Sequence, residues 1–337
     1  MFRLAGFGGM AREGGRCALP STTYPGFASL LTGRLPENHG VRTTNEAPAG
    51  AGSWARVRTV VGSTLFDSCK ATRLRSAAIQ GDQKLHAVLA TERAAEIWPP
   101  GGMPSAGTKL DAHGYPVNAE IRPFALAALA DHDLRFVFVH LNETDTLGHD
   151  LGPGHPATLA AAWATDALVG ELVDALGTDW ERSVLVVTSD HDMEPRTGLP
   201  PIRLGDVDGL ETLVLHVAED GGAAVLELTA GASPATVGAR LDAVPGVAAV
   251  RAAGPGLAIA EARRGWVFAG AGATPGGSHG GPATARTLAI VGGGHPSVGH
   301  IADSIARRRP HLVDWAPTIA SILGLRLESM DGIDLGA

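Results

Sequence analysis

Short apolar runs that end in polar residues alternate along this chain with segments of helical periodicity. The expected strands lie at residues 73–82, 134–145, 183–193 and 287–294. The expected helices lie at residues 158–177 and 312–325. Strands that are apolar on both faces are typical of parallel sheets covered by helices on both sides. The sequence therefore predicts an α/β fold with a mostly parallel sheet and helices on both faces.

One region departs from this alternation. Residues 205–265 contain two or three strand-like runs and one amphipathic helix, and we expect no catalytic residues there. We expect a small α+β insertion there, at the edge of the main fold. The predicted catalytic domain then consists of residues 1–204 and 266–337.

Composition limits the classes of function. The chain has 337 residues, of which 45% are hydrophobic, and a formal net charge of −8. This is the composition of a globular protein, and the negative charge argues against a general nucleic-acid-binding surface. The two cysteines, Cys17 and Cys69, are too few for a thiolate metal site and fit a reduced compartment or one incidental pair. With no apolar run of about 20 residues and no signal-peptide pattern, the default expectation is a soluble cytoplasmic protein.

Acidic residues and histidines follow the predicted strands. Asp145 and His149 form an Asp-x-x-x-His pair after one strand, Asp190 and His191 follow another, and His279 lies in a glycine loop before a third. In open α/β sheets, functional residues lie beyond the carboxyl ends of the strands. Carboxylates and imidazoles without thiolates suit zinc, manganese or iron, and a pair of metals about 4 Å apart is suited to phosphoryl transfer. A single Asp after a strand is more often a turn or capping residue, so the prediction depends on the combination.

A hydroxyl residue stands where a helix is expected to begin. In the segment TTYPGFASLLTGRLPENHG, Thr23 precedes Tyr24-Pro25 and an apolar run. A threonine at the first turn of a helix is either a cap or, where a metal lowers its pKa, a nucleophile. Capping is the better interpretation of this segment alone, whereas Asp190 and His191 as metal ligands favour the nucleophile.

Together these motifs resemble the alkaline phosphatase superfamily, and within it the type I phosphodiesterase/nucleotide pyrophosphatase branch, which includes phosphonoacetate hydrolase-like enzymes. The matching segments are TYPGFASLLTGRLPENHG, DTLGHDLGP, SDHDM, HG at 279–280 and the terminal VDWAPTIASILGLRLESMDGIDL. The resemblance implies an alkaline phosphatase-like fold and a hydrolase of phosphodiesters, nucleotide pyrophosphates or phosphonates. It also implies two divalent metals, usually zinc, and a covalent phosphothreonine intermediate.

The resemblance further assigns roles to individual residues. Asp145, His149 and His279 would bind one metal, while Thr23, Asp190 and His191 would belong to the other. Asn45 is the candidate for the asparagine that helps to bind an oxygen of the transferred group. The implied substrate is a small phosphodiester or nucleotide, and nothing in the sequence predicts an oligomeric state.

One element of the family pattern is not visible. Members open with a buried strand that ends in Asp-Gly, and its aspartate binds the nucleophile-side metal. Here Gly8-Gly9 stands only shortly before Thr23, and the segment FRLAGFGGMAREGGRC resembles the helix that follows the first strand. We therefore expect a chain that lacks this strand and its aspartate, with unpaired neighbouring strands.

Three other functions remain open. A sulfatase would need Cys or Ser followed by Pro and Arg, whereas this chain has Thr23 and then Gly26 after Pro25. A phosphomonoesterase would differ only in contacts within the pocket. A degenerate or truncated relative that binds without catalysing is favoured by the missing aspartate and opposed by the five metal-ligand candidates and the nucleophile.

Overall fold

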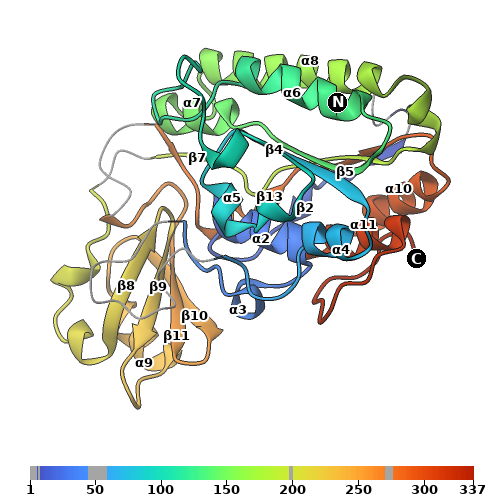
Figure 1. Cartoon of the computed structure of the whole chain (residues 1–337). Coiled ribbons are helices and arrows are strands. Elements are labelled where there is room, and N and C mark those ends of the chain that lie inside the picture. The colour runs from blue at the N-terminus through green and yellow to red at the C-terminus, as the bar shows by residue number, and fades with distance from the viewer. Residues whose placement is uncertain (1–5, 7, 45–58, 197–199, 270–275) are drawn as a thin grey trace.

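The structure is a computed structural model that describes residues 6, 8–44, 59–196, 200–269 and 276–337. It confirms the α/β class, with strands between layers of helices (Figure 1). The α-helices are α2 (Thr23–Thr32), α3 (Pro36–His39), α4 (Leu65–Ala71), α5 (Leu85–Val88), α6 (Asn118–Ala130), α7 (Glu143–Leu151), α8 (Pro156–Leu176), α9 (Pro234–Leu241), α10 (Ser297–Arg307) and α11 (Trp315–Leu323). Both predicted helices are present, as α8 and, after a short 3₁₀ turn at Leu312–Asp314, as α11.

The strands of the main body form two three-stranded sheets. One has the order β4 (Glu96–Trp98), β3 (Arg75–Gln80), β5 (Leu134–His140), and all of its strands are parallel. The other has the order β1 (Gly8–Met10), β14 (Ala289–Gly292), β6 (Leu185–Thr188), with β14 antiparallel to both neighbours. Two short antiparallel pairs join β2 (Gly15–Arg16) to β13 (Arg286–Thr287) and β7 (Glu194–Pro195) to β12 (Gly277–Ser278).

The N-terminal segment corrects one expectation from the sequence. The interpretation of FRLAGFGGMAREGGRC as a helix is wrong for Gly8–Met10 and Gly15–Arg16, which are strands. Gly8 lies so close to β14 that a Cβ atom there would be 2.1 Å from the carbonyl oxygen of Val291. Because Gly8 has no side chain, β1 can come close enough to β14 to pair with it. A helix with side chains in this place could not approach β14 so closely.

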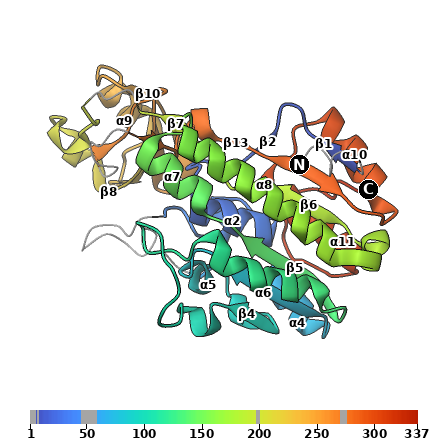
Figure 2. The same ribbon diagram turned by 90° about the horizontal axis from the view of Figure 1, so that it is seen from above.

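Helices cover the strands on both faces. In Figure 1, α6 and α8 lie on one side of the sheet, and α2, α4 and α11 lie on the other. Seen from above, α8 crosses the molecule between the two three-stranded sheets, and α10 lies at the end of the molecule where β1 is found (Figure 2). Strand β14 is buried along its whole length and β3 along most of it, whereas the residues of β6 are only half-buried.

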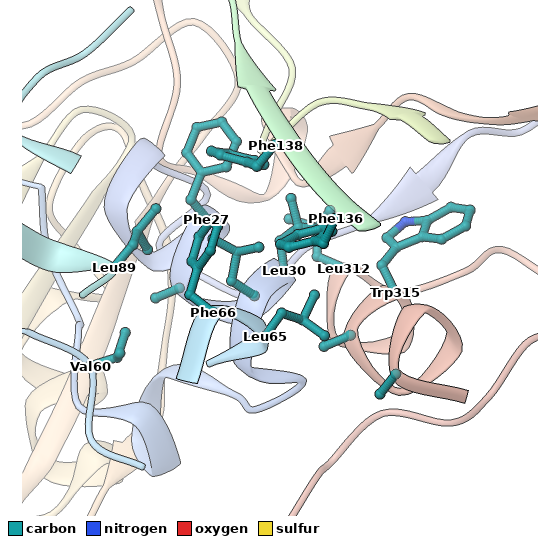
Figure 3. Close-up of a cluster of buried hydrophobic side chains, with 14 of the residues drawn as sticks. Phe27, Leu30, Val60, Leu65, Phe66, Leu89, Phe136, Phe138, Leu312 and Trp315 are labelled. Atoms are coloured by element: carbon teal, nitrogen blue, oxygen red, sulfur yellow. The ribbon is translucent and has the colours of Figure 1, made fainter. Parts of the chain in front are cut away.

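Aromatic side chains from four elements form the centre of the core (Figure 3). Phe27 of α2 meets Phe138 of β5 edge to face, with ring centroids 5.7 Å apart. Phe66 of α4 packs against Phe136 of the same strand at 5.2 Å. Trp315 of α11 is also buried in this cluster. These contacts fix α2 against the sheet, and α2 carries the candidate nucleophile at its first residue.

The two sheets leave a cavity between their facing strands. Among the described strands β5 pairs only with β3, and β6 only with β14. A cavity of about 940 Å³ is lined by residues of both strands, by α8, and by α2 and α11. The same cavity extends to the carboxyl ends of β5 and β6, where the predicted metal ligands lie. The apolar interior between the sheets is therefore continuous with the candidate site.

Residues of the predicted insertion form a separate sheet. Its order is β10 (Val247–Gly254), β11 (Leu257–Ala262), β9 (Ala223–Leu228), β8 (Val214–Asp220), and every neighbouring pair is antiparallel. The sheet has four strands rather than two or three, and α9 packs against it. Leu226, Val237 and Leu241 belong to an apolar cluster distinct from that of the main body. This part of the chain lies to one side of the main sheets (Figure 1).

Two expectations about the whole chain can be compared with the structure. Cys17 and Cys69 are both buried and free, so they form no incidental pair. Among the helices that the structure describes, none is long and apolar enough to cross a membrane.

His39 should make the free energy of unfolding depend on pH. Its ring is buried, and its Nδ1 accepts a hydrogen bond from the Val41 amide at 3.1 Å. Burial lowers the pKa of His39 to about 3, below the ordinary value of 6.5. Only the unfolded chain therefore gains a proton at this residue as the pH falls below about 6.5. Stability is full above that pH and should fall by about 1.4 kcal/mol per pH unit below it because of this residue.

The measurement is urea denaturation between pH 4.5 and 7.5 for the native chain and for His39→Gln. The substitution removes the titrating group. The slope of the unfolding free energy against pH should therefore decrease by the amount that corresponds to about one bound proton. Comparison with the native chain isolates His39 from other buried histidines. Identical slopes for the two proteins would contradict the assignment.

Candidate active site

Thr23 is the first residue of α2, and Thr22 precedes it in extended conformation. The Thr22 side chain makes no capping hydrogen bond to the helix. Thr23 Oγ1 instead lies 3.3 Å from His191 Nε2. The first turn of a helix has free N–H groups and favours negative charge. The geometry therefore gives the Thr23 hydroxyl a position suited to attack on an anionic substrate.

Gly26 allows α2 to approach the end of β6. A Cβ atom at this position would lie 2.8 Å from the Asp190 Cβ atom and 3.1 Å from the Asp190 carbonyl oxygen. Any larger residue would have to move the helix or the loop after β6. The sequence Tyr24-Pro25-Gly26 thus sets Thr23 beside Asp190 and His191.

Asp145 lies among three of the predicted histidine ligands. Its carboxylate oxygens are 3.6 Å from His149 Nε2, 3.9 Å from His191 Nε2 and 3.9 Å from His279 Nε2. Asp145 and His149 are one turn apart on α7 and therefore share a helix face. The Nε2 atoms of His149 and His279 are only 2.9 Å apart. Side chains from three distant parts of the sequence thus direct their donor atoms to one place.

Asp190 and His191 follow β6 and face the same place. The Asp190 carboxylate lies 3.2 Å from His191 Nε2. The His191 ring stacks on that of His279, with centroids 3.8 Å apart. The sequence assigned His191 to the nucleophile-side metal and Asp145 and His279 to the other. In the structure His191 Nε2 lies between these groups, within reach of Thr23, Asp190 and Asp145.

The charges of these residues depend on one another. Burial favours the neutral ring of His191, but the negative charges of Asp190 and Asp145 outweigh it and raise its pKa. Burial and the neighbouring His191 lower the pKa of His279 well below the ordinary value. Burial also raises the pKa of Asp190. Buried acids and imidazoles that perturb each other in a cavity are typical of functional sites.

The donor set fits divalent metal ions. Asp145 Oδ1 and His279 Nδ1 are buried and have no hydrogen-bond partner among the described residues. Ligand atoms of Asp145, His191 and His279 all lie within 4.8 Å of one another. Carboxylate oxygens and imidazole nitrogens are the ligands that zinc and manganese accept. The residues present can therefore hold a metal, which would also satisfy the buried Asp145 oxygen.

Backbone pairing fixes the loop that carries His279. Ser21 and Gly280 exchange two backbone hydrogen bonds, of 3.0 and 3.1 Å. The Gly222 amide donates to the carbonyl oxygen of His279 at 2.7 Å. Gly280 has a φ of +105°, a conformation that side-chain-bearing residues rarely adopt. The glycine-rich sequence around His279 thus serves close packing against the segment before Thr23.

Sequence reasoning missed three groups beside the site, of which Asp82 and Asp220 are buried and His140 is half-buried. Asp82 follows β3, and burial raises its pKa to about 6. His140 ends β5, packs its ring against Phe27, and has a pKa lowered to about 4 by burial. Asp220 ends β8, and burial raises its pKa to about 6. Asp82 is the last residue of the predicted strand 73–82, and this position could have indicated a role. Nothing in the sequence distinguished Asp220 from a turn residue.

Of the seven residues that the sequence assigned to the site, the structure brings six together. They are Thr23, Asp145, His149, Asp190, His191 and His279, and all six line the same cavity. Asn45 lies outside the described residues.

The family model for "Type I phosphodiesterase / nucleotide pyrophosphatase" matches residues 8–253, which is most of the chain. The chain belongs to this family. The resemblance seen in the motifs is thereby confirmed, and the family's description is that of hydrolases. No curated protein matches the chain by sequence.

Solved structures share the fold at low identity. Murine ectonucleotide pyrophosphatase/phosphodiesterase 5 is similar with a TM-score of 0.71 and 17% identity, over 98% of this chain and 91% of that one. Phosphonoacetate hydrolase from Sinorhizobium meliloti 1021, in complex with phosphonoacetate, gives 0.66 and 19%, over 96% and 88%. An inactive variant of the murine protein in complex with AMP, with a threonine replaced by alanine, gives 0.70 and 16%, over 98% and 91%. The alkaline phosphatase-like architecture is thus shown for this chain.

Proposed function

We propose that this protein is a two-metal hydrolase that cleaves phosphodiester, nucleotide pyrophosphate or phosphonate bonds through a phosphothreonine intermediate on Thr23. The observation that carries the proposal is the position of Thr23 Oγ1. It lies at the start of α2 and 3.3 Å from His191 Nε2, beside the cluster of Asp145, His149 and His279. An inactive threonine-to-alanine variant of the murine relative agrees with a nucleophilic threonine.

One of the six residues, Thr23, is the nucleophile, and the other five would hold the metals. Asp145, His149 and His279 would hold one metal, while Asp190 and His191 would hold the other beside Thr23. Bound metals would neutralise the phosphoryl oxygens and lower the pKa of a hydroxyl or water, as they do in other two-metal sites. Zinc is the metal we expect, with manganese or iron as alternatives.

The chain's own groups orient the reaction. Thr23 gives its hydroxyl proton to the solvent, and Oγ1 forms a bond to phosphorus while the bond to the leaving oxygen, or to carbon in a phosphonate, breaks. The leaving group departs with the electron pair of the broken bond and takes up a proton from the solvent. The free N–H groups at the start of α2 favour the negative phosphoryl group at this position. His191, whose Nε2 atom lies 3.3 Å from Thr23 Oγ1, would hold its metal beside this hydroxyl. A water molecule then displaces Thr23 from phosphorus, which releases the product and restores the hydroxyl.

The preferred substrate class can be tested by comparing esters with one leaving group. We expect bis(4-nitrophenyl) phosphate to be cleaved at least about tenfold faster than 4-nitrophenyl phosphate, measured as kcat/KM at equal metal occupancy. A nucleotide pyrophosphate and phosphonoacetate belong in the same series, because the solved relatives act on or bind such compounds by name. Faster cleavage of the monoester would favour a phosphomonoesterase, and cleavage of a sulfate ester alone would favour a sulfatase.

A non-catalytic, degenerate relative is the alternative from another class. Its basis is that the aspartate which ends the first strand in family members was not found in this sequence. Metal binding without turnover of any of these compounds would favour that alternative.

A further inference from the structure

The hairpin turn between β8 and β9 contacts both sides of the candidate site. On one side the Gly222 amide donates to the carbonyl oxygen of His279 at 2.7 Å. On the other side the Asp220 carboxylate accepts from Thr22 Oγ1 at 3.1 Å. Gly221, between them, has a φ of +63°, and a Cβ atom there would lie 2.0 Å from the His279 carbonyl oxygen. A turn of the predicted insertion is therefore packed directly against the segments that carry Thr23 and His279.

Asp220 is hydrogen-bonded to Thr22 directly and is connected to Tyr24 through Thr44. Its Oδ2 atom accepts from the Thr22 hydroxyl and, at 2.7 Å, from the Thr44 amide. The hydroxyl of Thr44 in turn accepts from the Tyr24 amide at 3.4 Å. Thr22 and Tyr24 are thus both connected to one carboxylate, directly in one case and through Thr44 in the other.

The burial of this carboxylate is costly. Asp220 is 4% exposed, and Thr22 is fully buried. A buried carboxylate is retained in proteins where it is well hydrogen-bonded, and removal of its partners leaves an uncompensated charge. In addition, Thr22 is the residue before α2 but does not cap the helix, so its hydroxyl is committed to Asp220 instead. This arrangement fixes the position of the first helical residue from outside the helix.

We propose that Asp220 is a positioning residue that holds Thr23 in place for attack through its hydrogen bonds to Thr22 and Thr44. The inference rests on the proposed function, because Thr23 is the residue whose placement matters. The insertion thereby takes part in catalysis without touching the substrate. A misplacement of about 1 Å in a nucleophile can cost about 100-fold in rate, so the loss of this contact should affect turnover more than binding.

The test compares Asp220→Asn, Thr22→Val and the double variant with the native chain. Each single variant should lower kcat by about 10- to 100-fold with KM changed less than about threefold. The double variant should be no worse than the more damaged single variant, because both remove one interaction. Thr22→Ser keeps the hydroxyl and should recover most of the activity. Glu261→Gln is the matched control, since Glu261 is a buried acid of the same sheet that pairs with Arg251.

Hydrogen exchange tests the role of Asp220 independently of the proposed enzymatic function. Hydrogen exchange should become faster in peptides spanning residues 20–44 of Thr22→Val and Asp220→Asn, and remain unchanged in Glu261→Gln. If the native chain cleaves no phosphoester, the proposed function fails while the exchange result still decides whether Asp220 holds this segment. Native kcat in both single variants, or additive losses in the double variant, would overturn the inference. Unchanged exchange in the segment would also overturn it.

Discussion

Replacement of Thr23 by alanine should lower kcat for a phosphodiester at least about 1000-fold, because the covalent route loses its nucleophile. The metal held by Asp145, His149 and His279 should stay bound in the variant, since these three residues do not depend on the Thr23 hydroxyl. The measurement is steady-state hydrolysis of bis(4-nitrophenyl) phosphate, with metal content determined by mass spectrometry on the same sample. Few single substitutions in this chain should have a larger effect.

Thr23→Ser is the control for this substitution. It retains a hydroxyl at the first turn of α2 and should keep activity within about tenfold of native. Full activity in Thr23→Ala would contradict the mechanism. Equal losses in both variants would show that the residue matters for packing rather than as a nucleophile.

Removal of the metals should have an effect of similar size. Exhaustive chelation should reduce turnover by about 1000-fold or more, and added Zn²⁺ should restore it. His279→Ala should bind about one metal fewer per chain and be equally inactive, because His279 contributes to the donor cluster with Asp145 and His149. Since the donor groups perturb one another's pKa values, metal affinity should also weaken as the pH falls and protons compete for the imidazoles.

His300→Ala provides the comparison for the metal experiment. His300 is exposed on α10, away from the cluster, and its loss should change neither metal content nor rate. Activity that survives chelation, with no metal left in the protein, would contradict a metal-dependent reaction.

Much of the fold followed from local patterns. Apolar runs followed by acids placed Asp145 and Asp190 correctly beyond the carboxyl ends of β5 and β6, because a continuous apolar run leaves a strong signal in sequence. Helix α8 and its end at Gly177 were similarly visible. The N-terminal segment was misinterpreted because β1 depends on glycine contacts with a strand almost 300 residues away, and local composition carries no information on such pairing.

The site was predictable to the extent that its residues belong to recognisable motifs. Thr23, His191 and His279 were found because each lies in a short pattern of known chemistry. Asp220 was not, because its importance comes from contact with Thr22, which is almost 200 residues distant in sequence. The position of His191 between the two ligand groups also depends on how three strand ends are brought together in space. Such relations are properties of the folded chain and leave no local signature.

The central claim is that Thr23 becomes covalently attached to phosphorus during turnover. Acid quenching of the metal-loaded enzyme within milliseconds of mixing with bis(4-nitrophenyl) phosphate, followed by peptide mass spectrometry, tests it directly. We predict a 4-nitrophenyl phosphate adduct on Thr23, formed together with a burst of 4-nitrophenol and absent from Thr23→Ala. A steady rate of hydrolysis without any adduct, or an adduct on a different residue, would contradict the account.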